Sequence, residues 1–328
     1  MSSINIVHWS NTPLVGSPAN ISNLTNDLVD YNSKHIVESD YPNNGTLYKE
    51  FTRDSLVLNN EEVLNQEIIN HFIEGADIVH IHNSIKEENL EKIFRINDRC
   101  KYIYHIHSPL KEGPLFFPQY RKFEGIFEEH LTVAQYQPRI YQKFIPVPNI
   151  IVRKPSINLI QNDELVRVIY SPTHLRPGRW NNKYSKNMVE VLESLDNIGM
   201  IKYINASNMK PDTLFEIRRT CHITIDEIVT GSFHQVSLEG LTAGNLTINA
   251  ADYFTKSIFN LSIKSNEEIP FYYTNTKDFK KDILNLVANY DLIRDYQKKS
   301  FNYAKNNLDP SALISQYKKI YNEVLHDS

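Results

Sequence analysis

Short runs of β-branched and aromatic residues alternate along the chain with longer segments whose apolar residues recur at helical spacing. In the first half the short runs are residues 4–9 (INIVHW), 78–83 (IVHIHN) and 102–107 (YIYHIH). Between them, residues 60–75 carry one apolar stripe and end at Gly75, a residue type that commonly follows the last turn of a helix. Strands separated by helices at this spacing indicate parallel βαβ units. The first half is therefore predicted to form a doubly wound sheet.

The alternation stops at residues 144–155 (FIPVPNIIVRKP), where three prolines exclude a regular helix. We place the boundary between two domains there, after residue 150. Beyond it the alternation resumes, which predicts a second domain of the same architecture. Its predicted strands are residues 166–172, 200–207, 223–228 and 245–250, and its predicted helices are residues 184–195, 212–220 and 232–243.

Two long helical patterns close the chain, over residues 277–306 and 309–327. The second begins at Asp309 and Pro310, because an Asp side chain caps a helix and proline fits its first position. Three parts are predicted: an N-terminal Rossmann-like lobe (1–150), a C-terminal Rossmann-like lobe (151–308) and a final helix (309–328) that could pack back on the N-terminal lobe. The predicted fold class is α/β, with two doubly wound lobes facing a central cleft.

Length, charge and cysteine content exclude several classes of protein and partner. A length of 328 residues fits two domains of about 150 residues each. The net charge of −4 gives no basic field for wrapping nucleic acid, so we predict no nucleic-acid partner and only a local phosphate site. The two cysteines, Cys100 and Cys221, are too far apart in sequence to indicate a disulfide framework or a zinc cluster. Without a signal-like segment or an apolar run of about 18 residues, a cytoplasmic protein is expected.

Residues 230–250 (TGSFHQVSLEGLTAGNLTINA) are the main candidate for a ligand site. In open α/β sheets, ligands bind beyond the carboxyl ends of strands, where the start of a helix offers unpaired N–H groups to phosphate. We predict a helix over 232–243, with Ser232 as its N-cap beside a phosphate and Glu239 two turns further on, within reach of ribose hydroxyls. The same spacing fits a packing helix with Glu239 on a partly solvated face, and spacing alone does not separate the two.

Four histidines alternate along two neighbouring strands of the first half and suggest a metal site at first sight. Alternate residues of a strand share one face, but no carboxylate or thiolate accompanies these imidazoles. We therefore predict no metal and favour neutral rings that hydrogen-bond within the protein. The four are His80, His82, His105 and His107.

Three further segments carry candidate chemistry with open alternatives. Arg176 and Arg179 lie in THLRPGRW, where arginine suits bidentate phosphate contact but is also a common solvated residue. Gly16 and Ser17 follow the first strand and could let backbone approach a ligand, or could simply start a helix with Pro18 at its first position. The segment FFPQYRKFEGIF, residues 116–127, could line an acceptor site or touch a membrane-linked lipid carrier, or could pack on its own aromatic rings.

The candidate ligand segment resembles the donor-binding motif of GT-B glycosyltransferases, especially family 4-like enzymes of bacterial surface polysaccharide synthesis. That motif reads approximately G-x-(F/Y)-G-x-x-x-x-E-A-(M/L)-A-x-G-x-P-V-I. The residues that match it are Phe233, Leu238, Glu239, Leu241, Ala243, Gly244 and Ile248.

Three other stretches agree with the same family in order. SPTHLRPGRWNNKYSKNMVEVLESL resembles its first strand-helix unit of the C-terminal lobe, where Arg176 and Lys183 match a basic pair that grips the diphosphate. DIVHIHNS and KYIYHIHSP resemble the paired strands of its N-terminal lobe, and His107 falls on the active-site histidine. VPN at 147–149 resembles the interdomain linker motif. The chain departs from the family at Gly231, where the family has the first glutamate of an E-x7-E pattern.

The resemblance implies a glycosyltransferase that moves a sugar from a nucleotide donor to a hydroxyl of a glycan or lipid-linked acceptor. It further implies retention of anomeric configuration. The helix start at Ser232 with Arg176 and Lys183 could stabilise the departing diphosphate without a metal ion, so no metal and no cofactor are expected, and the enzyme could contact the inner face of the membrane peripherally. His107 would contact the transferred sugar or phosphate. The donor would be bound by Arg176, Lys183, Ser232, Phe233, His234 and Glu239, with Gly16 and Ser17 as a phosphate or acceptor loop.

Two alternatives remain open at this point. The first is a non-catalytic GT-B relative that binds a partner transferase or a glycan, which the departure at Gly231 motivates. The second is a sugar-nucleotide epimerase of the same fold, which would interconvert donors without any acceptor.

Overall fold

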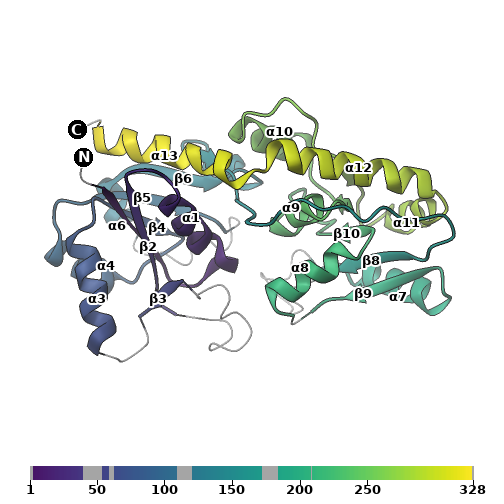
Figure 1. Cartoon of the computed structure of the whole chain (residues 1–328), viewed down its shortest axis with the longest axis horizontal. Coiled ribbons are helices and arrows are strands. Elements are labelled where there is room, and N and C mark those ends of the chain that lie inside the picture. Colours follow the sequence, from purple (N-terminus) through teal and green to yellow (C-terminus); the bar gives the residue numbers. More distant parts are fainter. Residues whose placement is uncertain are drawn as a thin grey trace. The chain divides into compact units, whose positions relative to one another are not determined.

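The computed structural model describes residues 3–39, 54–58, 63–108, 120–171, 184–207 and 209–326. The chain divides into two compact units (Figure 1). The N-terminal unit consists of residues 1–150 together with 310–328, and the C-terminal unit consists of residues 151–309.

The N-terminal unit is built on a parallel sheet of seven strands in the order β3-β2-β1-β4-β5-β6-β7. Its strands are β1 (Ile4–Ser10), β2 (Tyr31–Val37), β3 (Ser55–Val57), β4 (Ile78–His82), β5 (Lys101–Ile106), β6 (Phe127–Val133) and β7 (Ile145–Val147). The main helices of the unit are α1 (Ser17–Asn26), α3 (Val63–Glu74), α4 (Glu87–Ile96) and α13 (Pro310–His326). Short helical turns occur at η1 (Leu14–Gly16), α6 (Tyr120–Phe123), η2 (Glu124–Ile126) and η3 (Gln137–Arg139).

The two faces of this sheet bury different kinds of side chain. One face is apolar, and there Val7, Val79 and Tyr104 pack with Ile69 of α3 and Leu90 of α4. Because side chains alternate along a strand, the intervening positions of β1, β4 and β5 point to the opposite face. That face carries buried imidazoles beneath the tyrosine rings of α13. The imidazoles belong to His8, His80, His82 and His105.

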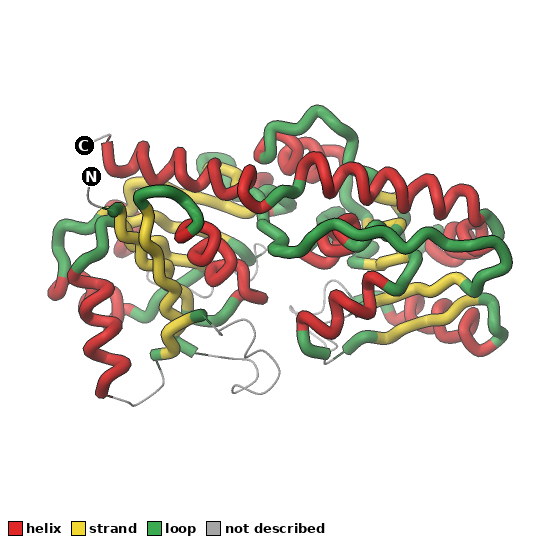
Figure 2. The backbone as a smooth tube through the Cα atoms, viewed as in Figure 1, coloured by secondary structure: helices red, strands yellow, loops and turns green. Residues whose placement is uncertain are grey.

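The C-terminal unit is built on a parallel sheet of five strands in the order β12-β11-β10-β8-β9. Its strands are β8 (Val166–Tyr170), β9 (Ile201–Asn205), β10 (Ile223–Ile225), β11 (Leu246–Asn249) and β12 (Phe271–Tyr273). Its helices are α7 (Lys186–Asn197), α8 (Pro211–Arg219), α9 (Gln235–Thr242), α10 (Tyr253–Ser262), α11 (Phe279–Val287) and α12 (Tyr290–Asn307). Helices lie on both sides of the strands (Figure 2), which confirms the predicted class of two Rossmann-like α/β lobes.

Two predicted helix boundaries were wrong. The donor-motif helix begins at Gln235, not at 232, because residues 226–234 form a loop that side chains hold in a non-helical path. The pattern over 277–306 is two helices, α11 and α12, and not one. Helix α12 begins separately because Asn289 caps it: the Asn289 side chain accepts a hydrogen bond from the backbone N–H of Leu292.

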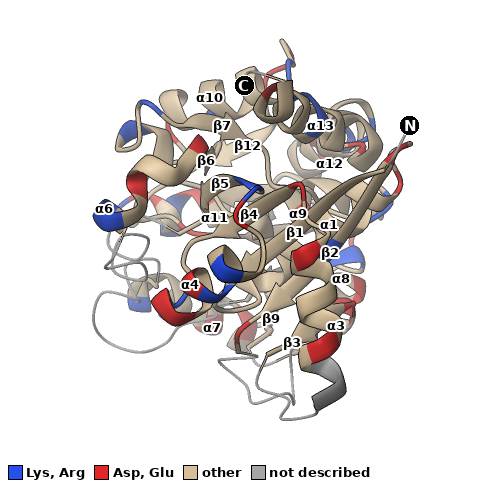
Figure 3. Ribbon diagram, turned by 90° about the vertical axis from the view of Figure 1, so that its left-hand side faces the viewer, with Lys and Arg blue, Asp and Glu red and all other residues tan. Residues whose placement is uncertain are grey.

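Charged residues lie largely on helices and loops, with both signs interspersed (Figure 3). Helix α4 is an example, since it carries three glutamates, a lysine and an arginine, while strands β1 and β4 carry no Lys, Arg, Asp or Glu. Among the described residues, no helix combines the length and apolarity that crossing a bilayer requires.

Candidate functional site

The loop between β10 and α9 is held by a buried glutamate. Both carboxylate oxygens of Glu227 accept hydrogen bonds from this loop, and the backbone N–H groups of Val229, Thr230 and Ser232 lie 2.7, 2.8 and 3.2 Å from them. The Thr230 hydroxyl donates to the same carboxylate. Glu227 is 1% exposed, so its charge is satisfied from within the protein. It fixes the loop path and leaves no carboxylate oxygen for a ligand.

Asp226 fixes the next part of the same loop. Its carboxylate accepts hydrogen bonds from the backbone N–H of His234 (2.5 Å) and the Ser237 hydroxyl (2.8 Å), and lies 3.2 Å from His234 Nδ1. Burial alone would raise the pKa of Asp226, but the charge and hydrogen bonds of His234 outweigh it and lower that pKa. The His234 ring, 22% exposed, is therefore tied to Asp226 at the start of α9.

The departure from the family pattern at 231 has a conformational reason. Gly231 has a φ of +82°, a left-handed conformation that glycine adopts without steric cost. A glutamate there would be strained, and the two carboxylates at 226 and 227 already satisfy the N–H groups of this turn. The glycine at position 231 is therefore explained by the conformation of this loop.

Ser232 and Phe233 are placed differently from the sequence prediction. Ser232 is not the N-cap of α9, since that position is taken by His234 and the Ser232 hydroxyl donates to the carbonyl of Phe233. Phe233 is fully buried, with its ring centroid 5.3 Å from that of Phe259 and 5.1 Å from that of Phe271. It anchors the loop in the core. The side chain of His234 does not cap α9, which leaves the first-turn N–H groups of the helix without a side-chain cap.

Glu239, which the sequence predicts to bind a ribose, is held from two sides. Its Oε2 lies 3.2 Å from Nη2 of Arg218, and its Oε1 accepts a hydrogen bond of 3.1 Å from the Gln235 side chain. The side chain of Glu239 is 19% exposed, whereas that of Arg218 is 0% exposed. One carboxylate at the surface is therefore fixed by a guanidinium within the protein.

Arg218 is the residue that sequence reasoning missed. Its Nη2 also lies 3.5 Å from the hydroxyl of Ser171, just after β8, and within the described residues its Nε and Nη1 have no hydrogen-bond partner. A signal was present, because Arg218 follows Phe215 by three positions and so falls on the buried face of α8. A cation on an apolar stripe is expected to have a buried anionic partner.

Gly240 lets α9 lie directly on the sheet. A Cβ atom at this position would come within 2.6 Å of Thr247 Oγ1 and 3.1 Å of Thr224 Cβ. We expect Gly240→Ala to lower the free energy of unfolding by about 1–2 kcal/mol, because overpacking outweighs the gain in helix propensity. Urea denaturation measures this, with Gly125→Ala as the control, since a Cβ there meets no atom within 4 Å. Equal stability of the two variants would contradict the close approach of α9.

In the N-terminal unit, His107 follows β5 at the carboxyl edge of the sheet and is held by Asn83. The Asn83 side-chain oxygen accepts the backbone N–H of His107 at 2.7 Å, and its amide donates to the Ser108 hydroxyl at 2.6 Å. Asn83 follows β4 with a φ of +59°, a conformation that Asn tolerates better than most residues. Sequence reasoning named His107 but not the asparagine that positions it.

The His107 ring continues a row of buried rings. His107 Nε2 lies 2.8 Å from His82 Nδ1, and His82 Nε2 lies 2.9 Å from His8 Nδ1. Burial lowers the pKa of His107 to about 3 and lowers those of His8 and His82 well below the ordinary value. These rings are therefore neutral at pH 7.

Two groups of three histidines place ligand nitrogens within 4.8 Å of one another, which is a geometric minimum for a metal site. The groups are His8, His80 and His82, and His82, His105 and His107. Neutral imidazole suits zinc and copper. Within these groups, however, the pairs at 2.8 and 2.9 Å are closer than two nitrogens on one tetrahedral zinc ion, which lie about 3.3 Å apart. The geometry is that of N–H···N hydrogen bonds.

Gly16 and Ser17 lie at the start of α1, beyond the carboxyl end of β1. Gly16 is the N-cap residue, with a φ of +81°, and Ser17 is the first residue of the helix. Ser17 is thus not the N-cap, and Pro18 is the second residue of the helix, not the first as predicted. Leu14 and Val15 also have positive φ values, 48° and 56°.

Arg176, Arg179 and Lys183 lie outside the described residues, as does the segment 116–119.

No protein-family model matches the chain, and no curated protein matches it by sequence. Solved structures do match it. An α-glucosyltransferase in complex with UDP and a 13-mer DNA containing an HMU base has a TM-score of 0.68 at 10% identity, over 99% of this chain and 100% of that chain. A glycosyltransferase from Rickettsia africae ESF-5 has a TM-score of 0.59 at 12% identity, with the same coverage. Sucrose-phosphate synthase from Thermosynechococcus elongatus has a TM-score of 0.53 at 11% identity, again over 99% and 100%.

These likenesses extend over whole chains and define the fold class. The two parallel α/β units are the two lobes of a GT-B fold, as the resemblance of the donor-motif segment predicts. Identities of 10–12% carry no residue roles from those proteins to this one.

Proposed function

We propose that the protein is a glycosyltransferase that uses a nucleotide-sugar donor. The observation that supports this most directly is the fixed carboxylate of Glu239. On a packing helix, a glutamate of this kind would be a loosely held surface residue. Here it is partly exposed and oriented by a fully buried arginine and by Gln235. Such an arrangement suits a carboxylate that must present fixed acceptor oxygens to the hydroxyls of a ribose.

The surrounding residues suit the remainder of a nucleotide. The first turn of α9 has no side-chain cap. The Asp226 carboxylate already accepts the backbone N–H of His234 just before the helix, so the remaining first-turn N–H groups are the candidates for binding an anion such as a diphosphate. Departure of that diphosphate is the step of glycosyl transfer that most needs positive potential. Arg176 and Lys183 are proposed as further cations, and His107 as the contact to the transferred sugar.

The finer points of the proposal follow the family resemblance. They are retention of configuration, independence from a metal ion, and a glycan or lipid-linked acceptor in surface polysaccharide or glycoconjugate synthesis. UDP is the first nucleotide to test, because the structures that are similar include α-glucosyltransferases in complexes with UDP and with UDP-glucose.

Nucleotide binding is the first experimental test. At about 100 times Kd, a ligand adds about 2.7 kcal/mol to the free energy of unfolding, which raises Tm by several degrees. We expect such a shift with one of UDP, GDP and dTDP, and release of that nucleotide from its sugar conjugates on adding acceptor. The acceptor panel contains glycan extracts, lipid-linked glycans and hydroxymethylated DNA.

Each arm of this experiment separates the proposal from an alternative. Conversion of a nucleotide sugar to its epimer without any acceptor would identify an epimerase and reject the transferase. Absence of both a thermal shift and nucleotide release with every donor would reject catalysis and leave a binding module. Glu216→Gln, on an exposed face of α8, is the control variant and is expected to keep the thermal shift.

A further inference from the structure

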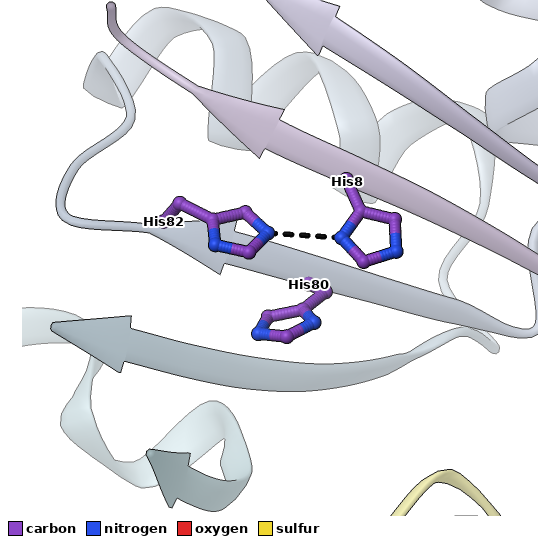
Figure 4. A group of neighbouring side chains, drawn as sticks. All are labelled: His8, His80 and His82. Carbon is purple, nitrogen blue, oxygen red and sulfur yellow. Dashed lines mark hydrogen bonds between the residues drawn. The ribbon is translucent and has the colours of Figure 1, made fainter. Parts of the chain in front are cut away.

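The row of buried histidines in the N-terminal unit forms a directed hydrogen-bond chain. His8 and His82 lie side by side on β1 and β4, with the hydrogen bond between them drawn in Figure 4. The chain continues from His82 Nδ1 to His107 Nε2. Both His8 and His82 are 0% exposed, while His107 is partly exposed at the sheet edge.

Each neutral ring has one N–H and one bare nitrogen, so the protons of this chain can be arranged in only two ways. In the inward arrangement, His107 donates from Nε2 to His82, and His82 donates from Nε2 to His8. His8 then carries its proton on Nε2. In the outward arrangement, His8 donates from Nδ1 to His82, and His82 donates from Nδ1 to His107. His8 Nε2 is then bare, and His107 carries its proton on Nδ1.

The buried end of the chain decides between the two arrangements. His8 Nε2 is buried and has no hydrogen-bond partner within the described residues. The inward arrangement would leave an N–H group there without an acceptor, which is rarer in proteins than an unpaired acceptor. The outward arrangement leaves only a lone pair. The outward direction is therefore the favoured one.

We propose that this chain fixes His107 as the Nδ1–H tautomer, so that His107 presents a hydrogen-bond donor, and not a base, beyond the sheet edge. His82 is then a positioning residue, because it donates to His107 Nε2 and occupies the lone pair that would otherwise accept a proton. The low pKa of His107 agrees with a ring that stays neutral. Its role at the site rests on the proposed function, in which the donor N–H would bind a sugar hydroxyl or a phosphate oxygen.

The tautomer can be measured without substrate, so this test stands apart from the test of the proposed function. Histidine labelled with 15N distinguishes N–H from bare nitrogen in each ring, and a through-hydrogen-bond coupling joins His82 Nδ1 to His107 Nε2. We expect Nδ1–H for His107 in the wild-type protein at pH 7.5. A proton on Nε2 of His107 would overturn the proposal even if every variant failed to fold.

Two variants test the positioning role. His82→Leu removes the donor to His107, and we expect the Nε2–H form of His107 to appear. His80→Leu is the matched control. His80 is equally buried and stacks on His82 with ring centroids 4.2 Å apart, but its Nδ1 is paired with the Tyr321 hydroxyl and it is no part of the chain. A control that changes the tautomer of His107 as much as His82→Leu does would overturn the positioning role.

A zinc titration of the wild-type protein adds a third outcome. Stoichiometric binding that shifts the 15N resonances of His8 and His82 together would show that these nitrogens hold a metal, and would overturn the hydrogen-bond chain. If the chain exists, zinc leaves those resonances unchanged.

For activity, we expect His82→Leu to lower kcat at least tenfold with little change in the KM for donor, whereas His80→Leu retains kcat.

Discussion

Lowering the pH from 7.5 to 5.5 is expected to destabilise the N-terminal unit strongly. Burial lowers the pKa values of five histidines in its sheet well below the ordinary value of about 6.5. These histidines therefore stay neutral in the folded state but are protonated in the unfolded state. As a result, the free energy of unfolding falls as the pH falls below about 6.5. Above pH 7.5 both states are neutral and the effect vanishes. The five are His8, His35, His80, His82 and His105.

The expected loss in the free energy of unfolding is comparable to the whole stability of a domain. At pH 5.5, one unit below the unfolded pKa, each histidine costs about 1.4 kcal/mol. Five together cost about 7 kcal/mol, and His107, whose pKa burial lowers to about 3, adds one further increment of the same size, against a typical domain stability of about 5–15 kcal/mol. In the C-terminal unit, burial lowers the pKa of His222 to about 4, so that residue contributes only one such increment. The N-terminal unit is expected to unfold first.

Tryptophan fluorescence can follow this unit alone. Trp9 is 1% exposed in β1 and donates to Glu38, so its emission reports the unfolding of the N-terminal sheet once Trp180 is replaced by Phe. His105→Leu is the informative variant, because neither nitrogen of His105 has a hydrogen-bond partner within the described residues. It should reduce the loss at pH 5.5 by about 1.4 kcal/mol. Unfolding free energies that stay constant between pH 7.5 and 5 would contradict the buried neutral row.

The alternation of the sequence was sufficient to predict the fold class, because central strands such as β1, β4 and β5 carry β-branched or aromatic runs, whereas β2 and β6 are interrupted by polar residues and were not predicted. The strand IVHIH is fully buried in β4, even though two of its five residues are histidines. Helix boundaries were harder to predict. The start of α9 depends on Asp226 and Glu227, whose hydrogen bonds keep the loop up to His234 out of a helix. Both residues follow β10 and bind N–H groups of their own loop, and such contacts have no signature in helical or strand spacing.

The candidate site shows the same division between local pattern and tertiary contact. Glu239 could be named as a candidate from the sequence, because its position in a motif is a local property. Arg218 could not be assigned to it, since the pair joins α8 to α9 across 21 positions. Likewise, alternation predicts that His80 and His82 share a face, but not that His82 contacts His8, because pairing between distant strands sets that contact.

The pair of Arg218 and Glu239 is expected to respond unequally to removal of its two members. Glu239→Gln leaves the guanidinium of Arg218 buried without its counter-charge, and breaking a buried pair in this way costs about 3–5 kcal/mol. Arg218→Met leaves a glutamate that is 19% exposed and can be hydrated. We therefore expect Glu239→Gln to lower the free energy of unfolding more than Arg218→Met does, as measured by urea denaturation. Replacing both residues together should restore most of the loss, because no unpaired charge remains.

Nucleotide affinity separates the structural role of this pair from its proposed role in binding. The double variant regains stability but has no carboxylate for the ribose, so its affinity for nucleotide should stay at least tenfold below that of the wild type by calorimetry. Glu216→Gln is the matched control, since Glu216 pairs at 2.9 Å with Arg219 on the exposed side of α8 and its loss should cost about 0–0.5 kcal/mol. If Glu239→Gln proved as mild as Glu216→Gln, the buried ion pair would not exist as described. If the double variant bound nucleotide normally, Glu239 would be a packing residue, and the proposed donor site would have to lie elsewhere.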